Sequence, residues 1–329
     1  MEVSAMNVET CSRCYAGVFH FGVDTFGEPS CWWNRAGRTA LGLTVAGTLG
    51  CATIVGARPM STSSPQRTTF HVLGVGQQRR GFLLHRPSAT IVRPLPVLIV
   101  LHGTSANANV VMDESGMNAI ADSIGALVVY PNGTGGIPYI RLFWNTEHCC
   151  GGAMGQGADE PGLVRAIIDS LDRRFPIDRS RVGVIGFSDA GSLAYSLACD
   201  AFETITAIGV IAGELPPTPC TPARGVSTLV FHGTADGNIR YGRTAEHVAE
   251  WAARQRCAGG RTTSTDALVH TAFRACNDAS ETELYTIVGG RHGWPGGRRS
   301  SWLAPRPPRS IDASRVFARF VMDHPRSTP

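Results

Sequence analysis

A serine in a glycine-rich turn, Ser188, is the residue of this sequence best suited to nucleophilic chemistry. It lies in Gly186-Phe-Ser-Asp-Ala-Gly191, between a β-branched run that predicts a strand and a stretch that predicts a helix. Such a strand–turn–helix exposes a serine hydroxyl on a sharp turn, and its usual pattern is G-x-S-x-G. Here the fifth position is Ala190, so the match is incomplete. Taken alone, the motif is equally compatible with an ordinary turn serine.

Two further residues supply what such a serine needs. A serine attacks efficiently only when an imidazole takes its proton and a carboxylate orients that imidazole. Asp236 follows the predicted strand 227–232, and His292 follows the predicted strand 283–288. The order serine, aspartate, histidine is that of an α/β-hydrolase triad. Singly, Asp236 could be an Asx-turn residue and His292 a loop histidine, one of ten in the chain.

The oxyanion of an acyl-transfer reaction requires backbone donors beside this serine. The apolar run Pro96–His102 predicts a central strand, and the loop after it usually provides one N–H. The residue after the nucleophile provides the other. We therefore expect the backbone N–H groups of Thr104 and Asp189 to form the oxyanion hole. His102 precedes the serine at a different strand, so we interpret it as a structural support of the loop.

Alternating strands and helices place these residues at one edge of a sheet. The pattern predicts an α/β fold of the α/β-hydrolase type: a mostly parallel, doubly wound sheet with helices on both faces. Ligands of such sheets bind outside the carboxyl ends of the strands. Strands are predicted at 69–75, 80–86, 96–102, 126–130, 181–187, 205–212, 227–232 and 283–288, and helices at 109–124, 159–175, 189–200, 243–256 and 311–323.

These motifs resemble the polyhydroxybutyrate depolymerase-like esterases, a group related to feruloyl and acetylxylan esterases. The resemblance implies a secreted serine esterase with Ser188, Asp236 and His292 as nucleophile, acid and base. It covers about residues 69–325, and the chain departs from it at Ala190, where glycine is usual. The matching segments are Leu101-His-Gly-Thr, Val128-Val-Tyr-Pro-Asn-Gly-Thr134, Trp144-Asn, Cys149-Cys-Gly-Gly152, Gly186-Phe-Ser-Asp, His232-Gly-Thr-Ala-Asp236 and His292-Gly-Trp-Pro-Gly-Gly297.

The substrate predicted from the sequence is a small ester or a short polyester or sugar ester. Trp144 and Trp294 lie in loops near the predicted site, where they could wall a substrate pocket or pack in the core. Few residues follow the last predicted helix, so a separate domain for adsorbing solid polymer is not expected. Two rival interpretations stay open: a catalytically silent surface binding protein, motivated by Ala190, and a peptidase or lipase with the same triad.

Composition and charge limit the partners. With 17% charged and 43% hydrophobic residues, the 329-residue chain is typical of a globular protein. Its net charge of +4 comes from arginine, without lysine, and no arginine run is dense enough for nucleic acid. We expect a monomer. No cofactor is expected, and no glycine-rich phosphate loop occurs. No metal is expected either, because Cys11-x-x-Cys14 lacks a matching second ligand pair.

The N-terminal part reads as an export segment ahead of the catalytic domain. Arg35 and Arg38 precede the uncharged stretch Thr39–Ala57, which predicts a signal over 35–57. Three fates compete: lipidation at Cys51, cleavage near Ala57, or an uncleaved membrane anchor. Residues 1–34 are expected to be unstructured or to precede the true translation start. A linker is predicted over 58–68 and an α/β-hydrolase domain over 69–325.

Cysteine usage fits an exported protein. The predicted domain contains six cysteines, and in an exported protein an even set indicates disulfides. Cys257 and Cys276 bracket a polar segment and form the pair we expect first. The adjacent Cys149 and Cys150 cannot readily bridge each other, so we expect them to pair with Cys199 and Cys220 in an unassigned order.

Overall fold

A computed structural model describes residues 67–88, 94–146, 152–300 and 304–326. The predicted segments 1–34 and 35–57, the lipidation candidate Cys51 and most of the predicted linker lie outside the described residues. Within the described residues, no helix is both long enough and apolar enough to cross a membrane. The described residues cover most of the predicted catalytic domain, 69–325.

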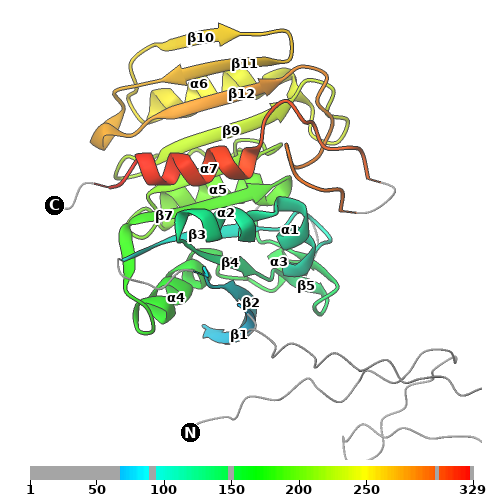
Figure 1. Cartoon of the computed structure of the whole chain (residues 1–329), viewed down its shortest axis with the longest axis vertical. Coiled ribbons are helices and arrows are strands. Elements are labelled where there is room, and N and C mark those ends of the chain that lie inside the picture. The colour runs from blue at the N-terminus through cyan, green and yellow to red at the C-terminus, as the bar shows by residue number, and fades with distance from the viewer. Residues whose placement is uncertain (1–66, 89–93, 147–151, 301–303, 327–329) are drawn as a thin grey trace, which may run out of the picture. The chain divides into compact units, whose positions relative to one another are not determined.

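Within the described residues, ten strands form one mixed sheet, as Figure 1 shows. The six central strands, from β4 to β12 in the order below, are paired in parallel, and the two outer strands at each edge are antiparallel. The predicted mostly parallel α/β sheet is confirmed. The order is β1 (Thr68–Val75), β2 (Gln78–His85), β4 (Leu127–Pro131), β3 (Leu95–Leu101), β7 (Ile177–Phe187), β8 (Ala207–Ile211), β9 (Ser227–Gly233), β12 (Thr282–Ile287), β11 (Leu268–Phe273) and β10 (Gly260–Ser264).

Helices cover both faces of this sheet, and each face has its own buried core. One core contains side chains of α4 (Glu160–Asp172), α5 (Asp189–Asp200) and α6 (Thr244–Arg254). The other contains side chains of α1 (Ala108–Ser115), α2 (Met117–Ile124) and α7 (Ala313–Asp323). In Figure 1, α1, α2 and α7 lie in front of the sheet and α5 and α6 behind it. Strands β3, β8 and β9 are buried along their whole length, as the apolar runs predicted.

The sequence missed several smaller elements. The helix predicted over 109–124 is two helices, because Gly116 adopts a left-handed conformation (φ 59°) that ends α1. A hairpin of β5 (Thr134–Ile137) and β6 (Arg141–Phe143), the short α3 (Gly152–Gly155) and two 3₁₀ turns, Tyr241–Arg243 and Asn277–Ala279, were not predicted. No element was predicted in the polar segment between Cys257 and Cys276, which contains strands β10 and β11.

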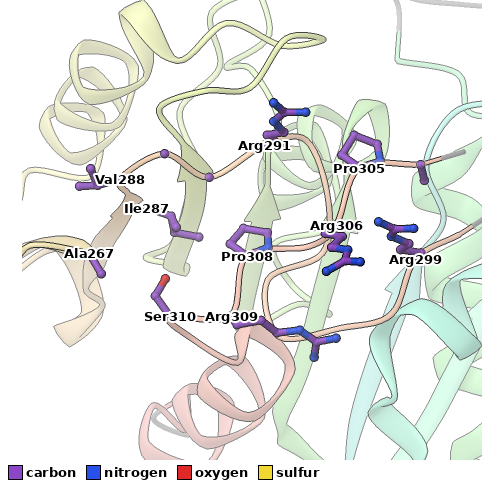
Figure 2. Close-up of a pocket in the computed structure, with 13 residues that line it drawn as sticks. Ala267, Ile287, Val288, Arg291, Arg299, Pro305, Arg306, Pro308, Arg309 and Ser310 are labelled. Atoms are coloured by element: carbon purple, nitrogen blue, oxygen red, sulfur yellow. The ribbon is translucent and has the colours of Figure 1, made fainter. Parts of the chain in front are cut away.

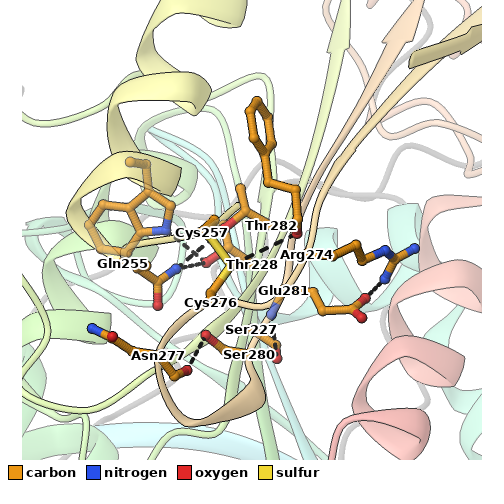
Figure 3. The surroundings of a disulfide bond; sticks show 12 residues. Ser227, Thr228, Gln255, Cys257, Arg274, Cys276, Asn277, Ser280, Glu281 and Thr282 are labelled. Carbon is orange, nitrogen blue, oxygen red and sulfur yellow. Dashed lines mark hydrogen bonds and ion pairs between the residues drawn. A yellow bond between two sulfur atoms is a disulfide. The ribbon is translucent and has the colours of Figure 1, made fainter. Parts of the chain in front are cut away.

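Two disulfides occur among the described residues. Cys257–Cys276 confirms the prediction and joins the chain just after α6 to the chain just after β11 (Figure 3). The predicted partners of Cys199 and Cys220 were wrong, because these two cysteines bond to each other. Both pack against the core under α4, α5 and α6, so the loop after β8 brings Cys220 back to the end of α5. Cys149 and Cys150 lie outside the described residues.

Figure 3 also shows a buried polar network beside the Cys257–Cys276 disulfide. The amide of Gln255 donates to the hydroxyls of Thr228 and Thr282, at 3.4 Å each. Its carbonyl oxygen accepts from the backbone N–H of Val226 at 2.8 Å. These contacts join the end of α6 to strands β9 and β12. They anchor the two strands whose carboxyl ends carry the predicted acid and base.

Candidate active site

Ser188 occupies a sharp turn between β7 and α5. Its backbone angles, φ 58° and ψ −125°, are rare for a residue with a side chain and indicate local strain. The turn is held by a hydrogen bond of 2.8 Å from the Ser188 N–H to the Ile211 carbonyl of β8. Gly186 is required here, because a side-chain methyl at that position would overlap the Ala190 carbonyl oxygen. The turn therefore projects the Ser188 side chain beyond the carboxyl end of β7.

His292 joins Ser188 to Asp236 through both ring nitrogens. Its Nδ1 lies 2.7 Å from Asp236 Oδ2, and its Nε2 lies 3.1 Å from Ser188 Oγ. With the Nδ1–H donated to the carboxylate, Nε2 is left to accept from the serine hydroxyl. Asp236 and His292 come from the loops after the parallel neighbours β9 and β12. The structure thus brings together three residues that are 104 positions apart from first to last.

The surroundings of Asp236 keep its carboxyl group ionised. Burial alone would raise its pKa, but the hydrogen bond and the charge of His292 lower the pKa below its ordinary value. The backbone N–H groups of Asn238 and Ile239 also donate to Oδ1, at 2.9 and 3.0 Å. The side chain is fully buried. A carboxylate held by three donors is well fixed for orienting an imidazole.

Two loops are locked together beneath this pair. The Ala235 N–H donates to the Gly290 carbonyl at 2.9 Å. A side chain on Gly233 would overlap the same carbonyl, so glycine permits this close approach. Below them, the buried His232 hydrogen-bonds to the Ile239 carbonyl and to the Thr244 hydroxyl, both at 2.9 Å. Burial lowers the pKa of His232, so it supports the Asp236 loop as a neutral ring.

The loop that carries Thr104 lies beside the serine. A Cβ built on Gly103 would be 3.5 Å from Ser188 Cβ, which brings the next residue, Thr104, to the nucleophile. The loop is tied down by the Ser105 N–H, which donates to the Leu142 carbonyl at 2.9 Å. Asp189 is the first residue of α5, where backbone N–H groups point out of the helix end. That the backbone N–H groups of Thr104 and Asp189 stabilise an oxyanion stays a prediction.

His102 is buried and neutral, as its interpretation as a structural residue requires. Burial lowers its pKa to about 4. Its Nδ1 lies 2.8 Å from the Gly103 carbonyl, and its Nε2 accepts from the Gly133 N–H at 3.0 Å. The ring thus fixes the loop after β3 to the loop after β4. This contact holds the backbone that leads to Thr104.

The two tryptophans named as pocket candidates are buried in the core. Trp144 is 1% exposed and donates from Nε1 to the His102 carbonyl at 2.7 Å. Trp294 is fully buried and donates to the Ser314 hydroxyl of α7 at 2.8 Å. Both residues are large and amphipathic, so the core takes their rings and a nearby acceptor takes their N–H. Of the two alternatives, the structure shows core packing.

Two residues that the sequence analysis did not single out, Phe187 and Glu114, lie near His292. The Phe187 ring lies 4.7 Å from the imidazole, centroid to centroid. A cavity of about 330 Å³ touches His292, Phe187, Asn238 and the buried Glu114. Phe187 could have been noticed, because it directly precedes the serine. Glu114 could not, because it lies in an unremarkable helix far away in the sequence.

The described residues offer no group of three or more histidine, cysteine, aspartate or glutamate side chains arranged to hold a metal ion. The site brings together a serine, an imidazole and a carboxylate, the side chains that nucleophilic acyl transfer uses.

Comparison with known proteins points to esterases. Residues 81–217 match the family model described as esterase PHB depolymerase. A protein of Nocardia uniformis subsp. tsuyamanensis named as an esterase, NocK, is 24% identical over 283 residues, covering 74% of this chain and 78% of that protein. A poly(3-hydroxybutyrate) depolymerase of Ralstonia pickettii is 24% identical over 274 residues, covering 69% of this chain and 53% of that protein. The resemblance stated from the motifs is confirmed.

A solved structure supports the same fold. The acetyl xylan esterase from Aspergillus awamori superposes with a TM-score of 0.55 at 16% identity, covering 77% of this chain and 99% of that one. At this identity the likeness concerns the fold alone. It confirms the predicted α/β-hydrolase architecture.

Proposed function

Because residues 81–217 are an esterase PHB depolymerase domain, we propose that the protein is a serine esterase acting through Ser188, His292 and Asp236. The observation that carries the proposal is the hydrogen-bonded chain from Asp236 Oδ2 to His292 Nδ1 and from Nε2 to Ser188 Oγ, at 2.7 and 3.1 Å. Each group has the role that its chemistry permits: nucleophile, general base and orienting carboxylate.

In the acylation step, Ser188 Oγ attacks the ester carbonyl while its proton moves to His292 Nε2. The carbonyl oxygen becomes an oxyanion, which the backbone N–H groups of Thr104 and Asp189 stabilise. Loss of one such donor typically costs about 3 kcal/mol of transition-state stabilisation. His292 then gives its proton to the alcohol oxygen as the C–O bond breaks, leaving an acyl-serine.

In the deacylation step, water takes the place of the alcohol. His292 accepts a proton from the water as its oxygen attacks the acyl carbonyl. Collapse of the second oxyanion releases the carboxylic acid and returns the proton to Ser188. Throughout, Asp236 keeps the imidazole in the tautomer that leaves Nε2 free to accept.

We propose short, soluble carboxylic esters as substrates. Two relatives are named as an acetylxylan esterase/xylanase and a poly(3-hydroxybutyrate) depolymerase, and the cavity that touches His292 has a volume of only about 330 Å³. A panel of short p-nitrophenyl esters, hydroxybutyrate oligomers, feruloyl esters and acetylated xylan tests the assignment. Highest kcat/KM for a short soluble ester is the expected result.

Export of the protein is part of the proposal. The disulfides Cys199–Cys220 and Cys257–Cys276 support an oxidising compartment. The choice among lipidation at Cys51, cleavage near Ala57 and an anchor stays a prediction. Mass spectrometry of the N-terminal peptide of the cellular protein distinguishes the three. Finding these four cysteines as free thiols in unreduced protein would contradict export.

The activity test uses p-nitrophenyl butyrate and two serine variants. We expect wild type to hydrolyse the ester and Ser188→Ala to lose nearly all activity, since the nucleophile is gone. Ser264→Ala, on the exposed strand β10, is the matched control and keeps wild-type activity. A wild type as inert as Ser188→Ala would instead favour the silent binding protein.

A further inference from the structure

A second, strongly cationic cavity adjoins the one that touches His292. Its volume is about 750 Å³, and four of its lining residues are arginines: Arg291, Arg299, Arg306 and Arg309. Figure 2 shows Arg291 on the loop after β12 and the other three on the loop that leads into α7. The two cavities share Arg299, Ala304 and Pro305 as lining residues. A ligand at His292 can therefore extend into the arginine-lined space.

None of the described residues that line this cavity is an aspartate or a glutamate. The cavity is otherwise bordered by small, proline and apolar residues. Arg309 donates to the Gly296 carbonyl at 3.0 Å, which positions its guanidinium without neutralising it. The carboxylate of Asp113 pairs with Arg298 at 2.9 Å. Arg298 lines the smaller cavity and is not among the residues that line the arginine-lined one. Several guanidinium groups around one cavity create a positive potential that attracts anions.

The acidic residue that lines the smaller cavity, Glu114, contributes little negative charge there. Glu114 lines the smaller cavity and is 4% exposed. Burial raises its pKa to about 7, so much of it is uncharged at neutral pH. The hydroxyl of Ser300 hydrogen-bonds to it. The arginine-lined cavity thus retains its positive charge.

The position of the cavity indicates which part of an ester it would meet. In serine acyl transfer the histidine that takes the serine proton later gives it to the leaving alcohol. The alcohol part must therefore lie at His292, which lines the smaller cavity, and that cavity shares lining residues with the arginine-lined one. Guanidinium groups bind carboxylates in a bidentate manner, which favours a carboxylate over a neutral polar group.

We propose that the arginine-lined cavity is a binding subsite for a carboxylate on the alcohol part of the ester. The inference rests on the proposed function and adds to it the chemical class of the substrate. Arg306 and Arg309 bind the carboxylate, and Arg299 lies where the subsite meets the cavity at His292. Esters of an alcohol that carries a free carboxylate are the preferred substrates.

The test compares 4-acetoxybenzoate with 4-acetoxybenzamide, which have the same shape and differ in charge. The measured quantity is the ratio of their kcat/KM values, in wild type, Arg306→Gln and Arg306→Glu. We expect the ratio to fall roughly tenfold in Arg306→Gln, the effect of losing one charged hydrogen bond, and further in Arg306→Glu. Comparing variants cancels the intrinsic reactivity of the two esters.

Arg319→Gln is the matched control. This variant also removes one positive charge, but from α7, where the Arg319 side chain is 84% exposed. It should leave the ratio unchanged. High salt should lower the wild-type ratio, because ions screen exposed charges over about 8–10 Å. A ratio that does not respond to Arg306→Glu, or that falls equally in Arg319→Gln, overturns the subsite.

Two further outcomes separate this inference from the proposed function. In the first, wild type hydrolyses 4-acetoxybenzamide, but the ratio of kcat/KM values is the same in wild type and in every variant. This result keeps the esterase activity and refutes only the subsite. Wild type that hydrolyses neither ester nor p-nitrophenyl butyrate refutes the esterase itself. If Arg306→Glu instead changes the ratio of mono-p-nitrophenyl succinate to p-nitrophenyl butyrate alone, the carboxylate belongs to the acyl part and the assignment is wrong.

Discussion

Gly186 lies against Ala190, so that a methyl group at position 186 would overlap the Ala190 carbonyl oxygen. The methyl group of Ala190 itself is fully buried and belongs to the core under α4, α5 and α6. The close approach of backbones in this turn is thus made at Gly186 and at Gly191, where a Cβ would lie 3.2 Å from Gly213 Cα. The departure from the usual motif is accommodated by the core, and Ser188 keeps its turn.

Ala190→Gly should therefore change activity little. We expect kcat/KM within about threefold of wild type, and a loss of stability of about 1–2 kcal/mol from the lost methyl burial and the lower helix propensity of glycine. Esterase assays and urea unfolding measure the two effects. Gly186→Ala is the contrasting variant and should abolish activity. A large gain of activity in Ala190→Gly would show that the methyl group strains the turn.

Asp236→Asn should reduce kcat by roughly 10³–10⁴-fold while the protein stays folded. The amide cannot stabilise the imidazolium and favours the wrong tautomer of His292. Asp266→Asn, in the exposed turn between β10 and β11, removes the same charge elsewhere and is the control. A loss smaller than tenfold in Asp236→Asn would argue against a general base at His292.

His102→Ala should lower both stability and kcat. The substitution leaves the buried Gly133 N–H without its acceptor, which costs about 1–3 kcal/mol of unfolding free energy. It also frees the loop that carries Thr104, so we expect kcat to fall about tenfold, less than the roughly 10²–10³-fold that outright loss of an oxyanion donor costs. Urea unfolding and steady-state kinetics measure these effects. Unchanged kcat in a folded variant would remove His102 from the support of the oxyanion loop.

Glu114 should make stability depend on pH. Burial raises its folded-state pKa to about 7, above the ordinary value of 4.5. The contribution of the protonated Glu114 carboxyl group to the free energy of unfolding is therefore fully present below pH 4.5 and is lost as the pH rises through 7. Glu114→Gln cannot ionise, so relative to wild type it should gain up to about 3 kcal/mol of unfolding free energy between pH 4.5 and 8. Urea midpoints for both proteins across this range give the difference, and parallel curves would contradict it.

The main elements could be predicted because their signals are local. All eight predicted strands occur, since apolar runs such as Leu95–Leu101 suit only a strand buried on both faces. The break at Gly116 was missed, because a glycine within a helical pattern does not by itself reveal a left-handed turn. Strand β10 was missed because it is polar and exposed throughout, and β11 was missed because it lies half-buried beside it near the sheet edge, without a strongly apolar run.

The chain positions of Ser188, Asp236 and His292 followed from strand order, whereas their surroundings did not. Phe187 and Glu114 line one cavity with His292, although both lie far from it in the sequence, in β7 and α1. The pairing of Cys199 with Cys220 likewise depends on the path of the loop after β8. Trp144 and Trp294 appeared as pocket candidates because sequence distance from a motif does not report burial.

The central claim is that Ser188 becomes covalently acylated with His292 as its base. The most direct measurement is peptide mass spectrometry of the protein after reaction with a fluorophosphonate, a reagent that phosphonylates activated serines. We expect one stoichiometric adduct, on the peptide that contains Ser188, and labelling of His292→Ala that is slower by at least about a hundredfold, in line with loss of general-base catalysis. An unlabelled Ser188 in folded, active protein, or an adduct on another residue, would contradict it.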